Sequence, residues 1–164
     1  MNPQKSPQYV PQSWLEWIWS IYDPDLYIVQ EQSYGTTIVI PASSVNTGTI
    51  QISNANTYFC YGWRTKGFVS ATGAVPTFPY RSGIRNAANN DWTNGQWLSA
   101  IVSQDNGAGA VYSVDWMLPR EVAQNEILQV TIDNTLNAAQ AITVDAVLVG
   151  YEVRSRTQKV QRLQ

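Results

Sequence analysis

One stretch of the chain, from Leu118 to Val153, constrains the fold more than any other. In its segment 127–133 the apolar residues Leu128, Val130 and Ile132 occupy every second position. Successive side chains of a β-strand point to opposite faces, so this alternation predicts a strand with one face on a hydrophobic core. The next residues, Asp133 to Asn137, are rich in types that bond their own backbone, and they predict a turn.

A second, longer strand is predicted after this turn. One of its faces carries Ile142, Val144, Ala146 and Leu148. The other face begins with Thr143 and Asp145 but becomes apolar at Val147, Val149 and Tyr151. Apolar residues on both faces indicate that the outer face is covered as well, by a loop, by the N-terminal segment or by a neighbouring subunit. We therefore expect an antiparallel hairpin at the centre of a β-sandwich.

The ends of this stretch add a resemblance to a known group of proteins. Leu118-Pro119-Arg120, the strand ending at Asn134, and Leu148-Val149-Gly150-Tyr151 are similar to the C-terminal half of small jelly-roll proteins from tailed-bacteriophage virions, which include capsid cement, decoration and neck proteins. The resemblance implies a structural protein of the virion, assembled in the cytoplasm of the host bacterium. The apolar segment 14–22, the apolar strand end from Val147 to Tyr151 and the two tails together indicate a homo-oligomer, for which the resemblance favours a trimer over a ring. The resemblance also implies the major capsid protein or other virion proteins as partners.

The remainder of the chain also suits an all-β, jelly-roll-like antiparallel sandwich over residues 26–153. With 164 residues it is large enough for one well-cored domain. Gly, Asn and Ser separate short apolar segments, a spacing typical of sandwiches and jelly rolls. The predicted strands are 26–31, 36–41, 48–53, 57–64, 66–71, 97–104, 110–117, 126–133 and 140–153, with a hairpin turn at 105–107.

Residues 1–25 are expected to form an extended arm followed by a short apolar helix. The arm is rich in Pro and Gln and contains Tyr9. Ser13 and Glu16 have the spacing of a capping box, which predicts a helix from Trp14 to Tyr22, ahead of Pro24. This helix has almost no polar face, so it must either plug the open end of its own sandwich or dock on a partner.

A long segment without periodicity, residues 72–95, interrupts the strand pattern and is predicted to be a loop. Its aromatic and arginine residues are types enriched in protein interfaces, although packing on the parent sandwich would also satisfy them. The candidate interface residues of the whole chain are Tyr9, Trp14, Trp17, Ile18, Trp19, Tyr22, Phe78, Tyr80, Arg81, Arg85, Trp92, Val147, Val149 and Tyr151. The basic tail, residues 154–164, is expected to be solvated or bound to a subunit.

The residues needed for most catalytic and metal sites are missing from the sequence. There is no histidine, the single Cys60 is expected to be a small buried apolar residue, and no phosphate-binding glycine loop is present. The net charge of −2 gives no long-range attraction for nucleic acid, and no apolar stretch is long enough to span a membrane. We therefore expect neither an enzyme nor a cofactor. The alternative function is a carbohydrate-binding jelly roll of a virion fibre or receptor-binding component, with exposed Trp and Tyr stacked on sugar rings.

Overall fold

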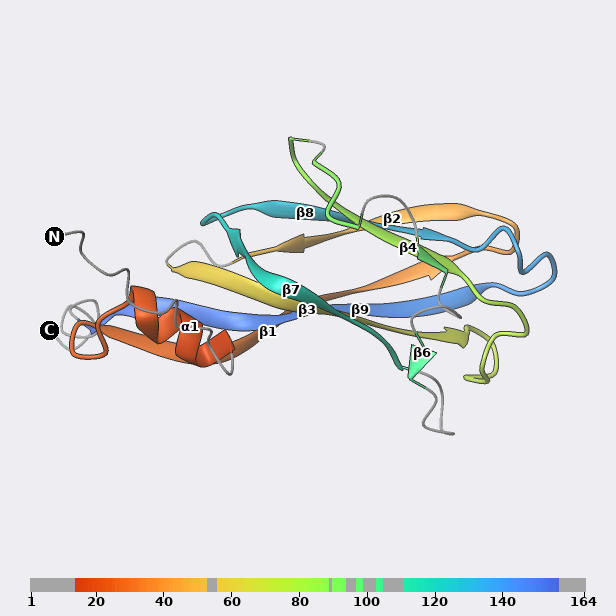
Figure 1. Ribbon diagram of the computed structural model, residues 1–164. Helices are drawn as coiled ribbons and strands as arrows, with labels where there is room; N and C mark the ends of the chain where they lie inside the picture. Colours follow the sequence, from red (N-terminus) through yellow and green to blue (C-terminus); the bar gives the residue numbers. More distant parts are fainter. Residues whose placement is uncertain are drawn as a thin grey trace, which may run out of the picture.

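The chain folds into two packed antiparallel sheets with one short helix against the outside (Figure 1). The computed structural model describes residues 14–52, 56–88, 90–93, 97–98, 103–104 and 111–156. The elements are α1 (Trp14–Ile21), β1 (Tyr27–Ile40), β2 (Val45–Gln51), β3 (Thr57–Val69), β4 (Arg81–Asn86), β5 (Trp97–Leu98), β6 (Ser103–Gln104), β7 (Val111–Val122), β8 (Ile127–Asp133) and β9 (Ile142–Ser155).

The order of the strands is that of a jelly roll. The larger sheet, here called sheet A, has the order β1-β9-β3-β7-β6, and the smaller, sheet B, has the order β2-β8-β4-β5. The chain passes between the two layers at most of its connections, so that strands adjacent in sequence face each other across the core. The predicted all-β sandwich is therefore confirmed.

The core lies between the sheets and contains the residues that the alternation predicted. Leu128, Val130 and Ile132 of β8 and Ile142, Val144, Ala146 and Leu148 of β9 are all fully buried. Trp63, Tyr58 and Tyr80 are the largest side chains added to them. Each buried aliphatic side chain of this kind stabilises the fold by about 1.5–3 kcal/mol relative to an exposed one.

The expected hairpin between the last two strands is wrong. β8 pairs with β2 and β4 in sheet B, whereas β9 pairs with β1 and β3 in sheet A. The eight residues from 134 to 141 carry the chain from one sheet to the other. Alternation correctly identified the buried face of each strand, but it carries no information about which strand lies beside it.

Two predicted pairs of strands are single long strands. β1 continues through Ser33, Tyr34 and Gly35, where the sequence predicts a break between the strands 26–31 and 36–41. β3 likewise continues from Thr57 to Val69, with a shift of register between Cys60 and Gly62. Ser and Gly mark turns only as a tendency, and here pairing with the 14-residue β9 keeps the backbone extended.

The predicted long loop, residues 72–95, contains a strand. β4 pairs with β8 from Arg81↔Asp133 to Asn86↔Leu128. Its buried positions are Ser82, Gly83 and Ile84, so the sequence offers only one large apolar residue to signal burial. The pairing partner, rather than local hydrophobicity, makes this segment a strand.

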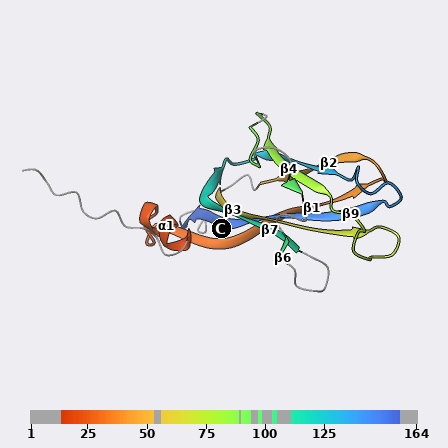
Figure 2. The same cartoon turned by 45° about the vertical axis from the view of Figure 1, so that its right-hand side comes forward.

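Helix α1 lies flat on the outer face of sheet A, where this sheet projects beyond sheet B (Figures 1 and 2). Ile18 is fully buried against Phe59 of β3 and Val153 of β9, and the ring of Trp17 meets that of Phe59 edge-on at 5.7 Å. The helix thus packs on its own sheet and does not plug the end of the sandwich. It covers the outer face of β9 at Tyr151 and Val153, but Val147 and Val149 are not part of this cluster.

Candidate functional site: an uncharged, apolar loop end

Exposed apolar side chains gather at the end of the sandwich opposite α1. Three connections meet there, residues 41–44, 70–80 and 134–141 (Figure 2). Of the eight large apolar residues that are exposed in the described part of the chain, five lie on or beside these connections: Val39, Val45, Val75, Phe78 and Leu136. Phe78 is 54% exposed, and Leu136 is 40% exposed. We call this region the loop end.

The three connections of the loop end contain no Asp, Glu, Lys or Arg. Charged residues make up 13% of the whole chain, so this end differs from the remainder of the sequence. An exposed apolar region without charge is costly to hydrate and is characteristic of a surface that another molecule covers. The loop end is therefore the best candidate for a binding surface.

Buried amide side chains hold the loop end in one conformation. The side chain of Asn137, 1% exposed, accepts a hydrogen bond from the Phe78 N–H at 3.0 Å and donates one to the Phe78 carbonyl at 3.0 Å. The fully buried Asn134 donates from Nδ2 to the carbonyls of Pro41 at 3.1 Å and Gln140 at 2.9 Å. These bonds tie the three connections together, so a partner meets a preformed surface.

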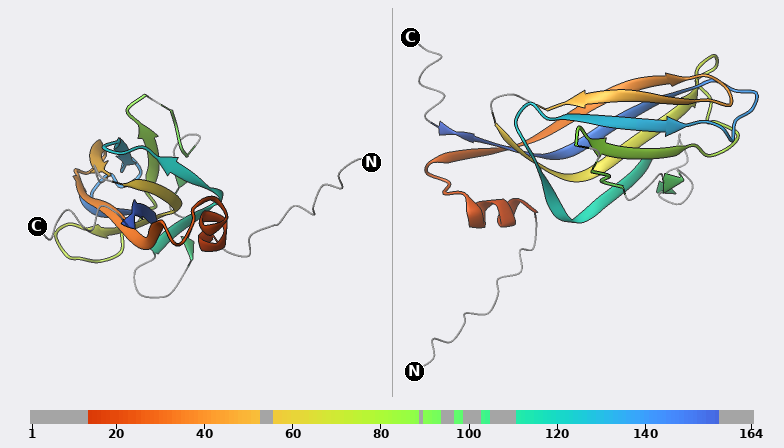
Figure 3. Two further views of the ribbon diagram at one scale, coloured as in Figure 1. Left: turned by 90° about the vertical axis from the view of Figure 1, so that its left-hand side faces the viewer. Right: turned by 90° about the horizontal axis from the view of Figure 1, so that it is seen from above.

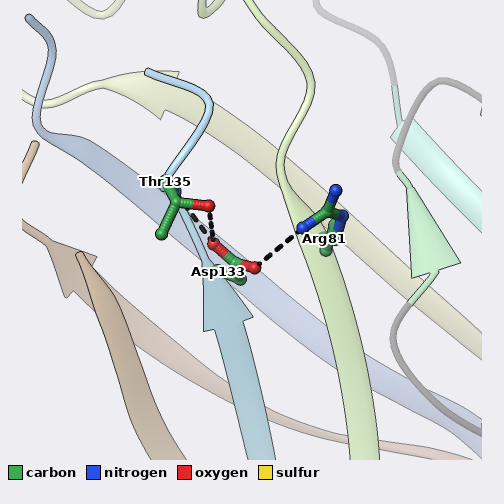
Figure 4. A network of polar contacts seen from close by, with 3 residues as sticks. All are labelled: Arg81, Asp133 and Thr135. Carbon is green, nitrogen blue, oxygen red and sulfur yellow. Dashed lines mark hydrogen bonds and ion pairs between the residues drawn. The ribbon is translucent and has the colours of Figure 1, made fainter. Parts of the chain in front are cut away.

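Charge appears only at the rim of the loop end, where it is neutralised. Arg81 of β4 donates from Nη1 to Oδ2 of Asp133 at 3.3 Å, and both the hydroxyl and the N–H of Thr135 donate to Oδ1 (Figure 4). Burial alone would raise the pKa of Asp133, but the bonds from Thr135 and then from Arg81 hold that pKa below its usual value. The pair closes β4 against β8 and adds no net charge.

Two of the predicted interface aromatics lie in the core. Tyr80 is 1% exposed, and its hydroxyl donates to Oγ1 of Thr65 at 3.0 Å. Its ring covers Gly67, where an added Cβ would lie 2.4 Å from the ring. Trp92 is also buried, and the guanidinium of Arg120 lies 5.6 Å from the centre of its ring. Their burial means that these two rings do not present a surface to a partner.

The two predicted arginines lie at opposite ends of β4. Arg81 is part of the rim pair with Asp133, whereas Arg85 is exposed and donates from Nε to Gln129 at 2.9 Å. Phe78 is thus the one predicted residue of the segment 72–95 whose aromatic ring is exposed at the loop end.

Of the predicted residues of α1 and β9, Trp17, Ile18, Tyr22 and Tyr151 lie together at the end opposite the loop end, whereas Val147 and Val149 lie in the middle of β9. Ile18 is buried, and the other described members of this group are half-buried: Trp14, Trp17, Trp19, Tyr22, Val147, Val149 and Tyr151. The Tyr151 ring lies 5.4 Å from that of Tyr61 on the outer face of sheet A. Tyr9 and the last residues of the basic tail fall outside the described residues.

The described residues provide no metal-binding constellation. No group of three His, Cys, Asp or Glu side chains among them could hold a metal ion, and none of the described helices is long and apolar enough to cross a membrane. Cys60 is fully buried, as predicted, and this burial raises its pKa to about 12, which leaves the thiol unreactive at neutral pH. Trp63 and Trp92 are buried, so neither can stack on a sugar ring.

Comparison with known proteins gives likenesses of structure but none of sequence. No family model and no curated protein matches the sequence. Among solved structures, a chain described as "Cyanophage Pam1 capsid asymmetric unit" is similar over 93% of this chain and 96% of its own length, with 16% sequence identity and a TM-score of 0.46. A likeness of this size assigns neither a family nor a function to the chain.

Sequence reasoning missed most of the loop end. Val75 and Leu136 stand alone among small and polar residues, so neither forms part of a pattern. The lack of charged residues in three separate connections was a usable signal. These segments come together only in the folded chain, so the sequence did not show that they form one surface.

Proposed function

We propose that this chain is a non-enzymatic structural protein of a tailed-bacteriophage virion, which binds and stabilises the capsid or the head–tail neck in the manner of a cement or decoration protein. The observation that carries the proposal is the loop end, a rigid surface that is apolar and uncharged. The resemblance of the segments Leu118–Arg120 and Leu148–Tyr151 to virion jelly-roll proteins supports the same role.

The physical task of such a protein is to add buried area between neighbouring subunits. Apolar contacts suit this task because they contribute about 25 cal/mol for each Å² of apolar surface that leaves water. A surface already fixed by Asn134 and Asn137 loses little conformational freedom on binding, so more of that contribution remains as affinity. We expect the major capsid protein or another virion protein to cover the loop end, after assembly in the host cytoplasm.

Co-sedimentation with particles assembled without this chain tests the proposal. Phe78→Ser should weaken binding about tenfold or more, since a buried Phe contributes about 1.5–3 kcal/mol and each 1.4 kcal/mol is tenfold in affinity. Ile127→Ser is the matched control, because Ile127 is 44% exposed but lies at the other end of β8. Unchanged binding by Phe78→Ser, or an equal loss with Ile127→Ser, would contradict the loop end as the attachment surface.

Purified virions test whether the protein is a structural part of the particle. Mass spectrometry of purified virions should detect the protein, and electron microscopy should place it on the outer shell or at the neck. Absence from the mature virion would contradict the structural role, whatever the variants show. We further expect the protein to act as a homo-oligomer, with a trimer favoured over a larger ring.

A further inference from the structure

Strand β1 leaves a long edge of sheet A open. It is the first strand in the order of that sheet, and it pairs with β9 without a break in register from Tyr27↔Ser155 to Ile40↔Ile142. No other described strand pairs with it. Its second edge therefore carries backbone N–H and C=O groups that have no neighbouring strand in the described part of the chain.

The register of β1 against β9 shows which residues of β1 point their N–H and C=O groups to the open edge. The Arg156 N–H donates to the Leu26 carbonyl at 3.0 Å, one step beyond the pair Tyr27↔Ser155. Hydrogen-bonded pairs alternate along an antiparallel ladder, so the even-numbered residues of β1 bond to β9. The odd-numbered residues point their N–H and C=O groups away from β9, toward the open edge.

Side chains close the two ends of this edge. The guanidinium of Arg156 donates from Nε to the Tyr27 carbonyl at 3.3 Å, and Asn46 donates from Nδ2 to the Val39 carbonyl at 2.8 Å. Between them lies a nine-residue window, Val29 to Thr37. Within it the exposed side chain of Gln32 reaches the Ser33 carbonyl at 3.3 Å, a contact that an incoming strand can replace.

In the described part of the chain, the window lacks most of the usual protection against strand addition. Natural edge strands are blocked by proline, lysine, bulges or short length. The window contains no proline and no lysine, its register has no bulge, and Glu31 is its single charge. An edge of this kind is satisfied by an extended backbone laid along it.

The N-terminal segment has the complementary pattern. Its prolines are Pro3, Pro7 and Pro11, which all have the same parity. In an extended strand, successive N–H groups point to opposite edges, and proline has none. All the lost donors therefore lie on one edge, while the other edge keeps the N–H of every even-numbered residue from 2 to 12. Such a strand can pair along one side and cannot be extended on the other.

Length and charge also match. Residues 2–12 would extend over roughly 36 Å and the window over roughly 30 Å, at about 3.3 Å per residue. Lys5 is the only charged side chain of this segment, and Glu31 is the only one in the window. Because Glu31 faces the outer side of sheet A, where Tyr61 donates to it at 3.0 Å, its carboxylate is accessible to a lysine on a strand laid beside β1.

We propose that the open edge of β1 binds residues 2–12 of a second copy of this chain as an added strand. The position of α1 favours a second copy over the same chain. Helix α1 lies beside sheet A (Figure 3). Trp17 and Tyr22 pack on Phe59 of β3, which is two strands away from β1 in the order of that sheet. To reach its own edge, the segment would have to cross β9 and β1, about 10 Å at 4.8 Å per strand, which takes about three residues and leaves about eight of residues 2–12 for the nine-residue window. The segment of a second copy can fill the whole window.

This contact joins unlike surfaces, the N-terminal segment of one copy and the β1 edge of the next. Head-to-tail contacts of this kind close into rings when the rotation between copies allows it. The added strand thus gives a physical basis for a trimer or a larger ring. It concerns self-association in solution and does not depend on the virion role.

The test uses two full-length variants with matched controls. Ser33→Pro removes one outward N–H and fills the edge with a ring, but leaves the ladder to β9 intact, because residue 33 does not bond to β9. Ser6→Pro removes a donor from the pairing side of the N-terminal segment and cannot disturb the sandwich. Each should weaken self-association about tenfold or more, because both lose ladder hydrogen bonds and strand contact. Ser33→Ala and Ser6→Ala keep every N–H and should associate as the unaltered protein does. Analytical ultracentrifugation gives the masses, and circular dichroism checks that Ser33→Pro is folded.

A mixing experiment identifies the second copy. A variant lacking residues 2–12 offers an edge without a strand, and Ser33→Pro offers a strand without an edge. Each alone should be monomeric, and an equal mixture should form a one-to-one complex. No complex in the mixture, association of Ser33→Pro equal to that of Ser33→Ala, or an unaltered protein that stays monomeric at every accessible concentration would each overturn the proposal.

Discussion

At the scale of single residues, buried amides and one carboxylate fix the shape of the loop end. Asn134 and Asn137 satisfy the carbonyls and the N–H groups of three connections that would otherwise be left unpaired. A buried backbone group without a partner costs about 1–3 kcal/mol, so these two side chains have a structural role out of proportion to their size. The sequence showed them only as turn residues.

Asp133 should make the free energy of unfolding depend on pH at acidic pH. Its pKa is lower in the folded chain than the value of about 3.9 for an unfolded one, so its contribution is present above that pH and is lost as the pH falls through the folded pKa. We expect the melting temperature of the unaltered protein to fall more steeply below about pH 4 than that of Asp133→Asn.

Thr135→Val provides the matched comparison. It removes the hydroxyl donor but keeps the Thr135 N–H and the Arg81 contact, so its dependence on pH should lie between the other two. Equal slopes in all three proteins would show that Asp133 is not held in its charged form.

At the scale of elements, α1 belongs to the fold although it lies outside the sandwich. Ile18→Ala should lower the free energy of unfolding by about 2–4 kcal/mol, because it opens a cavity against Phe59 and Val153. Ile21→Ala, at a position 55% exposed in the same helix, should change it by less than about 0.5 kcal/mol. Urea denaturation measures both, and similar values would contradict the packing of α1. A truncation that preserves the sandwich must therefore end before Trp14.

The sequence predicted some elements well and others poorly, for a physical reason. β8 and the first half of β9 alternate large apolar and polar residues, so their buried faces could be predicted directly. β4 hides Ser82 and Gly83, and those residues are buried only because β8 lies beside them. The surface at the loop end depends on three connections meeting in space, which no local pattern records.

At the scale of the whole molecule, the two sheets fold as one unit because they share a single core. Val130 lies at the centre of the shared core with no exposed surface. Val130→Asp should prevent soluble folding, since an unpaired buried carboxylate costs several kcal/mol against a total stability of about 5–15 kcal/mol. Ile127→Asp, on the exposed end of the same strand, should remain soluble with a native circular dichroism spectrum. Soluble, native-like Val130→Asp protein would contradict the core.

The sequence predicted the fold class, a β-sandwich, but it did not predict which strands lie beside one another. Many short alternating segments with Gly and Asn between them suit any sandwich, and Leu128 and Leu148 would be buried in several topologies. The choice of β1 and β3 as neighbours of β9 depends on contacts between residues about a hundred positions apart, for which a single sequence gives no signal.

The two longest paired strands, β1 and β9, run from the loop end to the projecting end that carries α1. A pull applied between these ends acts along the strands, parallel to their axes. In that shear geometry the hydrogen bonds of the ladder share the load at the same time, whereas a sideways pull would open them one after another. The molecule is thus mechanically strongest along the line that joins the loop end to the end that carries α1.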